Sequence, residues 1–141
     1  MWKKAIAVLV SMMLLCTSFL CVSAQTVSSG DSEIAPLLQY TNNYRTTLSV
    51  SGGQASLVAD FNGYDGITTK VVITMTLQKK GFLGLWWSDE ASWTETFYSY
   101  DAMMYRKHSV SDGTYKVKAE YVAYSGSKSE TITDYSEEIK K

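Results

Sequence analysis

From residue 44 onward, apolar and polar residues alternate with a period of two, which is typical of β-strands that bury one face. The clearest run is residues 70–78, where only Val72 interrupts the polar face. No stretch of this part of the chain shows the 3.6-residue period of an amphipathic helix. The alternation predicts strands at residues 44–51, 55–61, 70–78, 86–97, 100–110, 115–123 and 130–135.

Three of these runs predict a buried face, because their apolar residues recur at every second position. We expect Phe61, Trp93, Tyr115 and Tyr121 to be the aromatic residues of the core. The three apolar faces consist of Ala55, Leu57, Ala59 and Phe61; Val71, Ile73, Met75 and Leu77; and Tyr115, Val117, Ala119, Tyr121 and Ala123.

Short glycine-containing segments separate the strands and predict tight turns. These segments are Gly52-Gly53, Asn62-Gly63 with Asp65-Gly66, Asp112-Gly113 and Ser125-Gly126-Ser127. The single proline, Pro36, precedes every strand, so it interrupts no ladder of hydrogen bonds.

About seven short strands with frequent turns predict an all-β protein, an antiparallel immunoglobulin-like or fibronectin-like β-sandwich. Tyr115 follows Asp112-Gly113 at the start of a strand, which resembles the tyrosine corner of immunoglobulin-like domains with a spacing one residue shorter. A closed barrel and a small jelly roll are the alternatives.

The N-terminus predicts export. Lys3 and Lys4 precede an apolar run from residue 5 to residue 15, and a small-x-small cleavage site ends at Ala24. We therefore expect a signal peptide helix at 1–24, a flexible lead-in at 25–36, the sandwich at 37–136 and a short polar tail at 137–141. An uncleaved anchor spanning residues 5–22 is the alternative. The predicted location is secreted, in the extracellular space.

Charge and cysteine content restrict the partners. Cleavage after Ala24 removes both cysteines, which fits a bacterial exported domain. Without Lys3 and Lys4 the chain has 11 Lys and Arg residues against 14 Asp and Glu residues, a net charge of −3. No basic stripe is present, so we expect no nucleic-acid partner. No membrane span is expected after cleavage.

Catalysis is not expected. His108 is the single histidine, and a serine-based triad would need partners such as Ser109, Ser111 or Asp112 beside it. No nucleophile-elbow sequence accompanies these residues. We interpret His108 as an exposed histidine near a strand end.

Carboxylates suggest two further kinds of site, neither of which the sequence supports. A glycosidase would need two carboxylates across a cleft, and the candidates near the tryptophans are Asp89, Glu90 and Glu95. Asp60, Asn62 and Asp65 do not match the calcium-loop spacing, and Asn-Gly and Asp-Gly are also turn sequences. We therefore predict no enzyme activity, no metal and no cofactor.

An apolar run at residues 81–87 is the candidate binding site, with Phe82, Leu85, Trp86 and Trp87 as its contact residues. Adjacent residues of a strand point to opposite faces, so one of the two tryptophans should be outside. The alternative is that one tryptophan enters the core while the other covers a sheet edge.

Several segments together resemble a family of small exported proteins of clostridial-type Gram-positive bacteria, whose function is not established. These segments are residues 38–41, 48–53, 77–80, 113–119 and 124–131, with Trp86 and Trp93 between them. The resemblance covers nearly the whole chain after the signal peptide. It implies a β-sandwich and an extracellular location, and it transfers no active site.

The sequence favours a secreted, non-catalytic module that binds an envelope polymer, a glycan or a protein through the aromatic hairpin. The alternative is a secreted antagonist, bacteriocin-like or membrane-active, which would insert residues 82–87 into a target bilayer.

Overall fold

The computed structural model describes residues 37–141; the predicted signal peptide helix and lead-in lie outside this range. The described chain forms eight strands, all paired in antiparallel fashion. In chain order they are β1 (Thr41–Ser51), β2 (Gln54–Gly63), β3 (Lys70–Lys80), β4 (Trp87–Phe97), β5 (Asp101–Ser109), β6 (Thr114–Ser125), β7 (Lys128–Tyr135) and β8 (Ile139–Lys140).

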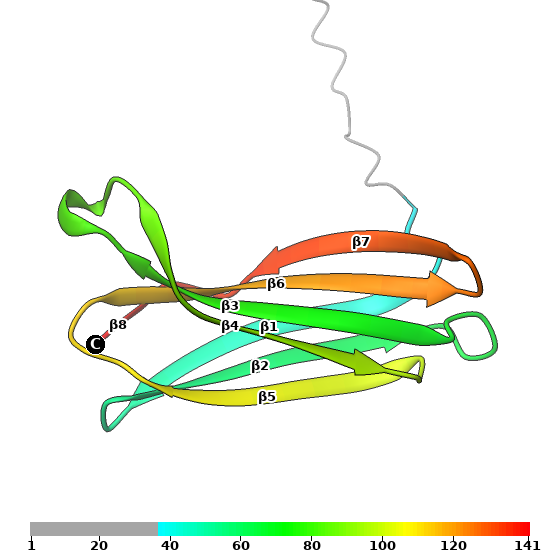
Figure 1. Ribbon diagram of the computed structural model, residues 1–141, viewed down its shortest axis with the longest axis horizontal. Helices are drawn as coiled ribbons and strands as arrows, with labels where there is room; N and C mark the ends of the chain where they lie inside the picture. The colour runs from blue at the N-terminus through cyan, green and yellow to red at the C-terminus, as the bar shows by residue number, and fades with distance from the viewer. Residues whose placement is uncertain (1–36) are drawn as a thin grey trace, which may run out of the picture. The chain divides into compact units, whose positions relative to one another are not determined.

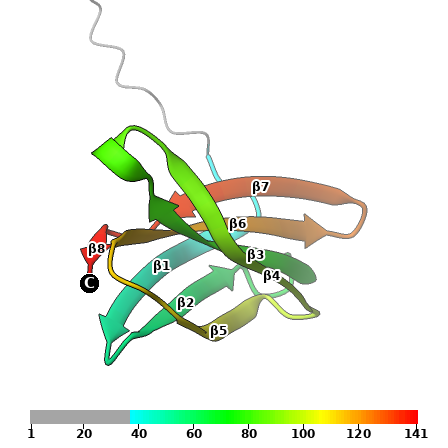
Figure 2. The same cartoon turned by 60° about the vertical axis from the view of Figure 1, so that its left-hand side comes forward.

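The strands form two sheets that pack face to face (Figure 1). One sheet has the order β1-β2-β5, and the other has the order β4-β3-β6-β7, with β8 also paired to β6. The chain crosses between the sheets after β2, after β4 and after β5 (Figure 2). The predicted antiparallel, immunoglobulin-like or fibronectin-like sandwich is confirmed, and the described strands form neither a closed barrel nor a jelly roll.

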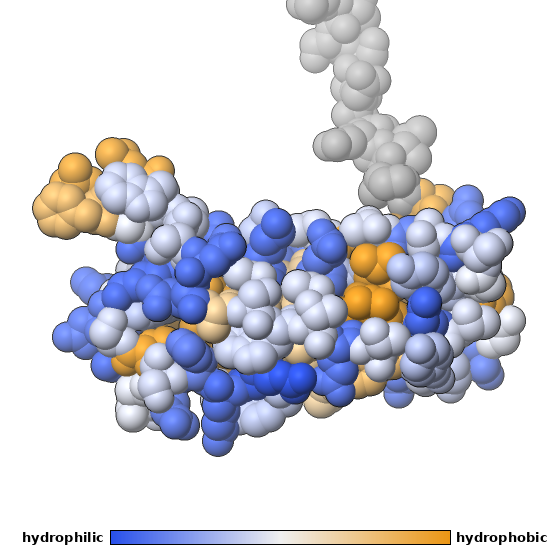
Figure 3. Space-filling model, in the orientation of Figure 1, coloured by the Kyte–Doolittle hydropathy of each residue, from blue (hydrophilic) through white to orange (hydrophobic). Residues whose placement is uncertain are grey.

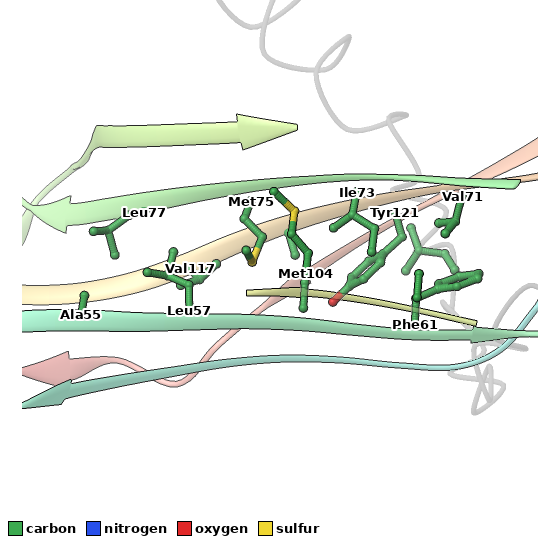
Figure 4. Packing of buried hydrophobic residues seen from close by; sticks show 14 of the residues in the cluster. Ala55, Leu57, Phe61, Val71, Ile73, Met75, Leu77, Met104, Val117 and Tyr121 are labelled. Carbon is green, nitrogen blue, oxygen red and sulfur yellow. The ribbon is translucent and has the colours of Figure 1, made fainter. Parts of the chain in front are cut away.

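The core lies between the sheets and consists of the faces that the alternation predicted. Every residue of the three predicted apolar faces is buried, and Figure 4 shows many of them meeting across the gap between the layers. Ala102 and Met104 of β5, Val110, and Ile132 of β7 also belong to this core. Phe61, Tyr115 and Tyr121 are buried as predicted, while Trp93 is half-buried and packs against the core from its edge.

The predicted turns hold with one exception. Gly52 and Gly53 both have positive φ, as a two-residue hairpin turn requires. The prediction that Asn62-Gly63 is a turn was wrong, because β2 continues through Gly63. Gly63 is buried there, and a Cβ on it would lie 2.5 Å from the Thr68 hydroxyl oxygen. The chain turns after it, at the predicted Asp65-Gly66, where the φ of Gly66 is +74°.

The tyrosine corner is present. Tyr115 is buried at the start of β6, and its hydroxyl donates a hydrogen bond of 3.0 Å to the carbonyl oxygen of Ser111. The four-residue spacing closes the connection from β5 to β6 in the way that immunoglobulin-like domains use.

The C-terminal residues form structure that the sequence pattern did not predict. Ile139 pairs with Tyr115, so β8 extends the five-stranded sheet beyond the end of β7. Ser136 connects β7 to β8, and its hydroxyl accepts a hydrogen bond of 2.8 Å from the backbone N–H of Val117. These contacts fasten the end of the chain to β6.

Candidate functional site

The candidate site is the connection between β3 and β4, which extends beyond the strands on either side (Figures 1 and 2). Lys80 and Trp87 form the last strand pair, so residues 81–86 make the loop. Two backbone hydrogen bonds hold it, from Gly81 N–H to the Trp86 carbonyl at 2.8 Å and from Gly84 N–H to the Gly81 carbonyl at 3.0 Å. The second of these bonds closes a tight turn at Phe82–Gly84, which forms the end of the loop and has non-helical backbone angles at Leu83.

Four large apolar side chains of this loop are exposed to solvent. The exposed fractions are 80% for Phe82, 74% for Leu83, 75% for Leu85 and 52% for Trp86. The orange atoms at the upper left of Figure 3 mark this region, at the place that the β3–β4 connection occupies in Figure 1. We call these four residues the apolar tip.

Leu83 adopts a backbone conformation that L-amino acids rarely use. Its φ is +68° and its ψ is +2°, and it is the only residue other than glycine with positive φ among residues 37–141. For a bulky side chain this left-handed conformation costs about 1–2 kcal/mol. Because Leu83 is mostly exposed, its contacts within the sandwich do not offset this conformational free energy.

The two adjacent tryptophans occupy different places. Trp86 covers Gly81 closely, since a Cβ on Gly81 would lie 2.2 Å from the indole Nε1 of Trp86. Trp87 is half-buried on the outer face of the five-stranded sheet, with the Lys116 Nζ 4.2 Å and the Lys80 Nζ 5.3 Å from its ring centroid. The alternative in which one tryptophan enters the core was wrong, because neither belongs to the buried cluster.

A bulge at Glu90 interrupts β4 near the end of the strand that adjoins the apolar tip. The register shifts opposite Leu77 and Gln78, so Glu90 has no partner on β3. This extra residue changes which positions of β4 face outward, and it explains why the alternation in residues 86–97 is irregular in the sequence.

Charged and polar side chains at the base of the loop make one ion pair and two further hydrogen bonds. The Lys80 ammonium lies 2.9 Å from a carboxylate oxygen of Glu138, and Lys79 donates a hydrogen bond of 2.7 Å to the hydroxyl of Ser111. The Asp89 carboxylate accepts a hydrogen bond of 2.8 Å from the Gln78 amide. The apolar tip therefore stands on a polar base of mixed charge.

The candidate catalytic residues make contacts with other residues rather than with each other. His108 is half-buried rather than exposed, because its ring lies 5.7 Å from the Trp93 ring in an edge-to-face arrangement. Ser111 interacts with Lys79 and Tyr115, and Asp112 lies 3.4 Å from the ammonium of Lys141. No side-chain hydrogen bond within residues 37–141 joins His108 to any of its suggested partners.

The carboxylates near the tryptophans do not face each other across a cleft. Glu95 pairs with Arg106 at 2.7 Å along the edge where β4 and β5 meet, while Asp89 and Glu90 are exposed. Of the calcium candidates, Asn62 accepts a hydrogen bond from Asn42, and Asp60 and Asp65 are exposed. In the described range, no group of three His, Cys, Asp or Glu side chains is placed to hold a metal ion.

The hollows on the sandwich are small and open. One of about 280 Å³ lies along β1, between Arg45, Thr47 and Glu137. Another of about 230 Å³ lies on the outer face of the three-stranded sheet, between Arg45, Val58 and Asp60. Neither contains the convergent polar side chains and apolar lining that are typical of a small-molecule site. Among residues 37–141, no helix is long and apolar enough to cross a membrane.

Comparisons with protein-family models, with curated proteins and with solved structures give no match to this chain. The resemblance to clostridial exported proteins therefore stays a prediction. Of the predicted contact residues, Phe82, Leu85 and Trp86 lie at the apolar tip, whereas Trp87 lies on the sheet face. Leu83 was not among the predicted contact residues, although its position between Phe82 and Gly84 in an apolar run was a usable signal.

Proposed function

We propose that this protein is a secreted, non-catalytic binding module that attaches to a component of the cell envelope through the apolar tip. The observation that carries the proposal is the exposure of Phe82, Leu83, Leu85 and Trp86 at the end of one hairpin. Contiguous apolar residues of this kind on a small soluble domain mark a contact surface.

Burial of the apolar tip by a partner would favour binding. Full burial of one large apolar side chain contributes about 1.5–3 kcal/mol. The tip has four such side chains, three of them at least 74% exposed, so a partner that covers them gains the largest part of that amount for each. Ordering costs are small because two backbone hydrogen bonds already hold the loop.

The chemistry of the loop favours an apolar partner over a sugar. A glycan site combines an aromatic ring with polar groups that hydrogen-bond the hydroxyls of the sugar. Residues 81–86 contain only glycine, phenylalanine, leucine and tryptophan, so the indole N–H of Trp86 is their single side-chain donor. Among the envelope components that the sequence suggested, a polysaccharide therefore has the least support from the loop.

The secreted antagonist remains the second candidate function, because the same apolar tip would serve to enter a target bilayer. The two functions differ in the consequence of binding for the target membrane. An antagonist of this type would release a dye that is trapped in vesicles, whereas a binding module would attach to them without leakage.

The test compares exported forms of the full chain, expressed in a Gram-positive secretion host. Mass spectrometry should give Gln25 as the first residue, as the predicted cleavage requires. Whole Gram-positive cells, cell-wall polysaccharide, wall-stripped cells and exported proteins are then offered to the wild-type chain and to the Phe82→Ser/Leu85→Ser variant.

We expect binding by the wild-type chain and its loss in the double variant. The matched control is Tyr98→Ser, because Tyr98 is 84% exposed but lies in the connection between β4 and β5. Equal binding by the double variant, with unchanged unfolding, would contradict a role for the apolar tip. Turnover of a substrate that depends on His108 or Glu95 would contradict the non-catalytic assignment.

A further inference from the structure

We propose that the envelope component bound by the apolar tip is the surface of a lipid bilayer, into whose interfacial layer the tip inserts. This inference rests on the proposed function and names its partner. The sandwich would stay outside the bilayer, with its polar faces in water, and the attachment would be peripheral.

The shape of the apolar tip favours a bilayer over a protein partner. The tip is a narrow protrusion beyond the strands, as Figures 1 and 3 show, rather than a flat patch or a groove. A stable protein interface buries roughly 800 Å² on each partner, and the end of one six-residue loop supplies that area only if the partner has a matching cleft. A bilayer is deformable, so it surrounds a convex apolar group without any preformed cleft.

The composition of the loop also suits lipid. Residues 81–86 have no charged and no hydroxyl side chain, so the exposed end carries no polar side chain to desolvate beyond the indole N–H of Trp86. Two internal hydrogen bonds satisfy backbone groups of Gly81, Gly84 and Trp86. Unpaired backbone groups are the main obstacle to inserting a loop into lipid, and insertion only to the interfacial depth leaves the remaining ones in contact with water and headgroups.

The residues behind the tip are those expected at the level of the headgroups. Trp86 is followed by Trp87, whose ring is flanked by the ammonium groups of Lys80 and Lys116 at 5.3 and 4.2 Å. Tyr135 adjoins the same lysine, 4.8 Å from the Lys116 ammonium to its ring centroid. Tryptophan, tyrosine and lysine at the base of an apolar segment are the residues that accumulate at the membrane–water interface.

The backbone of Leu83 indicates that its side chain has a function. Glycine or asparagine would adopt its positive φ at a lower cost, yet the position carries a leucine whose side chain is 74% exposed. A strained conformation without internal compensation indicates a function that needs the side chain. Leucine at the end of a protrusion is suited to burial in acyl chains.

Charge does not drive the proposed attachment. Lys80 is paired with Glu138, and the chain that remains after the predicted cleavage has a net charge of −3. The apolar tip should therefore bind neutral vesicles of phosphatidylcholine, and salt should not release it.

The test uses the exported form of the full chain with vesicles of phosphatidylcholine alone and with vesicles that also contain phosphatidylglycerol. Binding is measured by co-sedimentation, and insertion by the quenching of tryptophan fluorescence with brominated lipids. We expect the wild-type chain to bind both kinds of vesicle at low and at high salt, with quenching that comes from Trp86.

Three variants make the result specific. Leu83→Asn introduces a residue that accepts positive φ and removes the apolar side chain. We expect its vesicle binding to fall about tenfold. Phe82→Ser/Leu85→Ser should lose binding and quenching altogether. Tyr98→Ser, which changes an equally exposed aromatic residue elsewhere, should bind like the wild-type chain.

The two proposals fail in different ways. Wild-type binding to cells, wall polysaccharide or exported proteins that depends on the apolar tip, without vesicle binding, overturns the bilayer assignment and leaves the binding module intact. Vesicle binding that is equal in the wild-type chain and in the double variant overturns the bilayer assignment as well. Loss of tip-dependent binding in every assay overturns both.

Discussion

The Tyr121 hydroxyl of β6 lies 2.9 Å from the Thr46 hydroxyl of β1 and thereby connects the two sheets. The same tyrosine donates a hydrogen bond of 3.0 Å to the carbonyl oxygen of Arg45, so the Thr46 hydroxyl is the donor in its contact with Tyr121. Both side chains are buried, and the Tyr121 ring packs against Phe61 and Tyr44. This group of contacts holds the edge strand β1 against the five-stranded sheet.

Tyr121→Phe should destabilise the fold by about 1–3 kcal/mol, because it leaves the buried Thr46 hydroxyl and the partly buried Arg45 carbonyl without this partner. Urea unfolding monitored by tryptophan fluorescence measures this loss. The matched control is Tyr135→Phe, which removes a hydroxyl from a half-exposed tyrosine of β7 and should change the free energy of unfolding by less than about 0.5 kcal/mol. Equal effects of the two substitutions would contradict the role of the Tyr121 hydroxyl.

The stability of the fold should fall at alkaline pH through Tyr121. Burial raises the pKa of Tyr121 from 10.0 to about 12, and this effect exceeds the hydrogen bond from Thr46, which lowers the pKa. The folded state therefore holds the proton more tightly than the unfolded chain, so this stabilisation is complete below pH 10 and is lost as the pH rises towards 12. The difference in unfolding free energy between wild type and Tyr121→Phe should shrink over that range. A difference that stays constant from about pH 9 to about pH 12 would contradict this.

Leu83→Asn should leave the fold as stable as the wild type or increase its free energy of unfolding by up to about 1 kcal/mol. Asparagine accepts the left-handed conformation better than leucine does, and the exposed leucine side chain makes little contact within the domain. Thermal and urea unfolding measure the change. Leu85→Asn, at a neighbouring exposed position without positive φ, is the control and should give no gain. A loss of more than about 1 kcal/mol in Leu83→Asn would show that the side chain packs within the domain.

Gly81→Ala should displace the Trp86 indole. The backbone of Gly81 has φ of −70°, which alanine adopts freely, so the only obstacle is the Trp86 ring, 2.2 Å from the added Cβ. We expect the NMR signal of the Trp86 indole N–H to shift, with a stability loss below about 1 kcal/mol because the half-exposed ring can rotate into solvent. In a Trp86→Ala background, the same substitution should have no further effect on stability. A loss that persists in that background would locate the conflict elsewhere in the loop.

The candidate site was only partly predictable. The apolar run at residues 81–87 is visible in the sequence, and its place after a strand ending in two lysines marks it as a hairpin end. Whether its side chains are exposed depends on what other strands bring near them. Trp87 illustrates this, because Lys116 of β6 covers its ring, and β6 lies far from it along the chain. The positive φ of Leu83 is likewise a consequence of closing this particular loop. A leucine at this position does not predict a positive φ.

The fold class, the three apolar faces and the tyrosine corner could all be predicted from the amino-acid sequence. These features depend on period-two alternation and on turn residues, which are local properties of the chain. Three other features became visible only in the folded domain: the extension of β2 through Gly63, the pairing of β8 with β6 and the contact between His108 and Trp93. Each of these results from two segments that meet in the folded sandwich, and pairing between distant segments leaves no periodic signal in either of them.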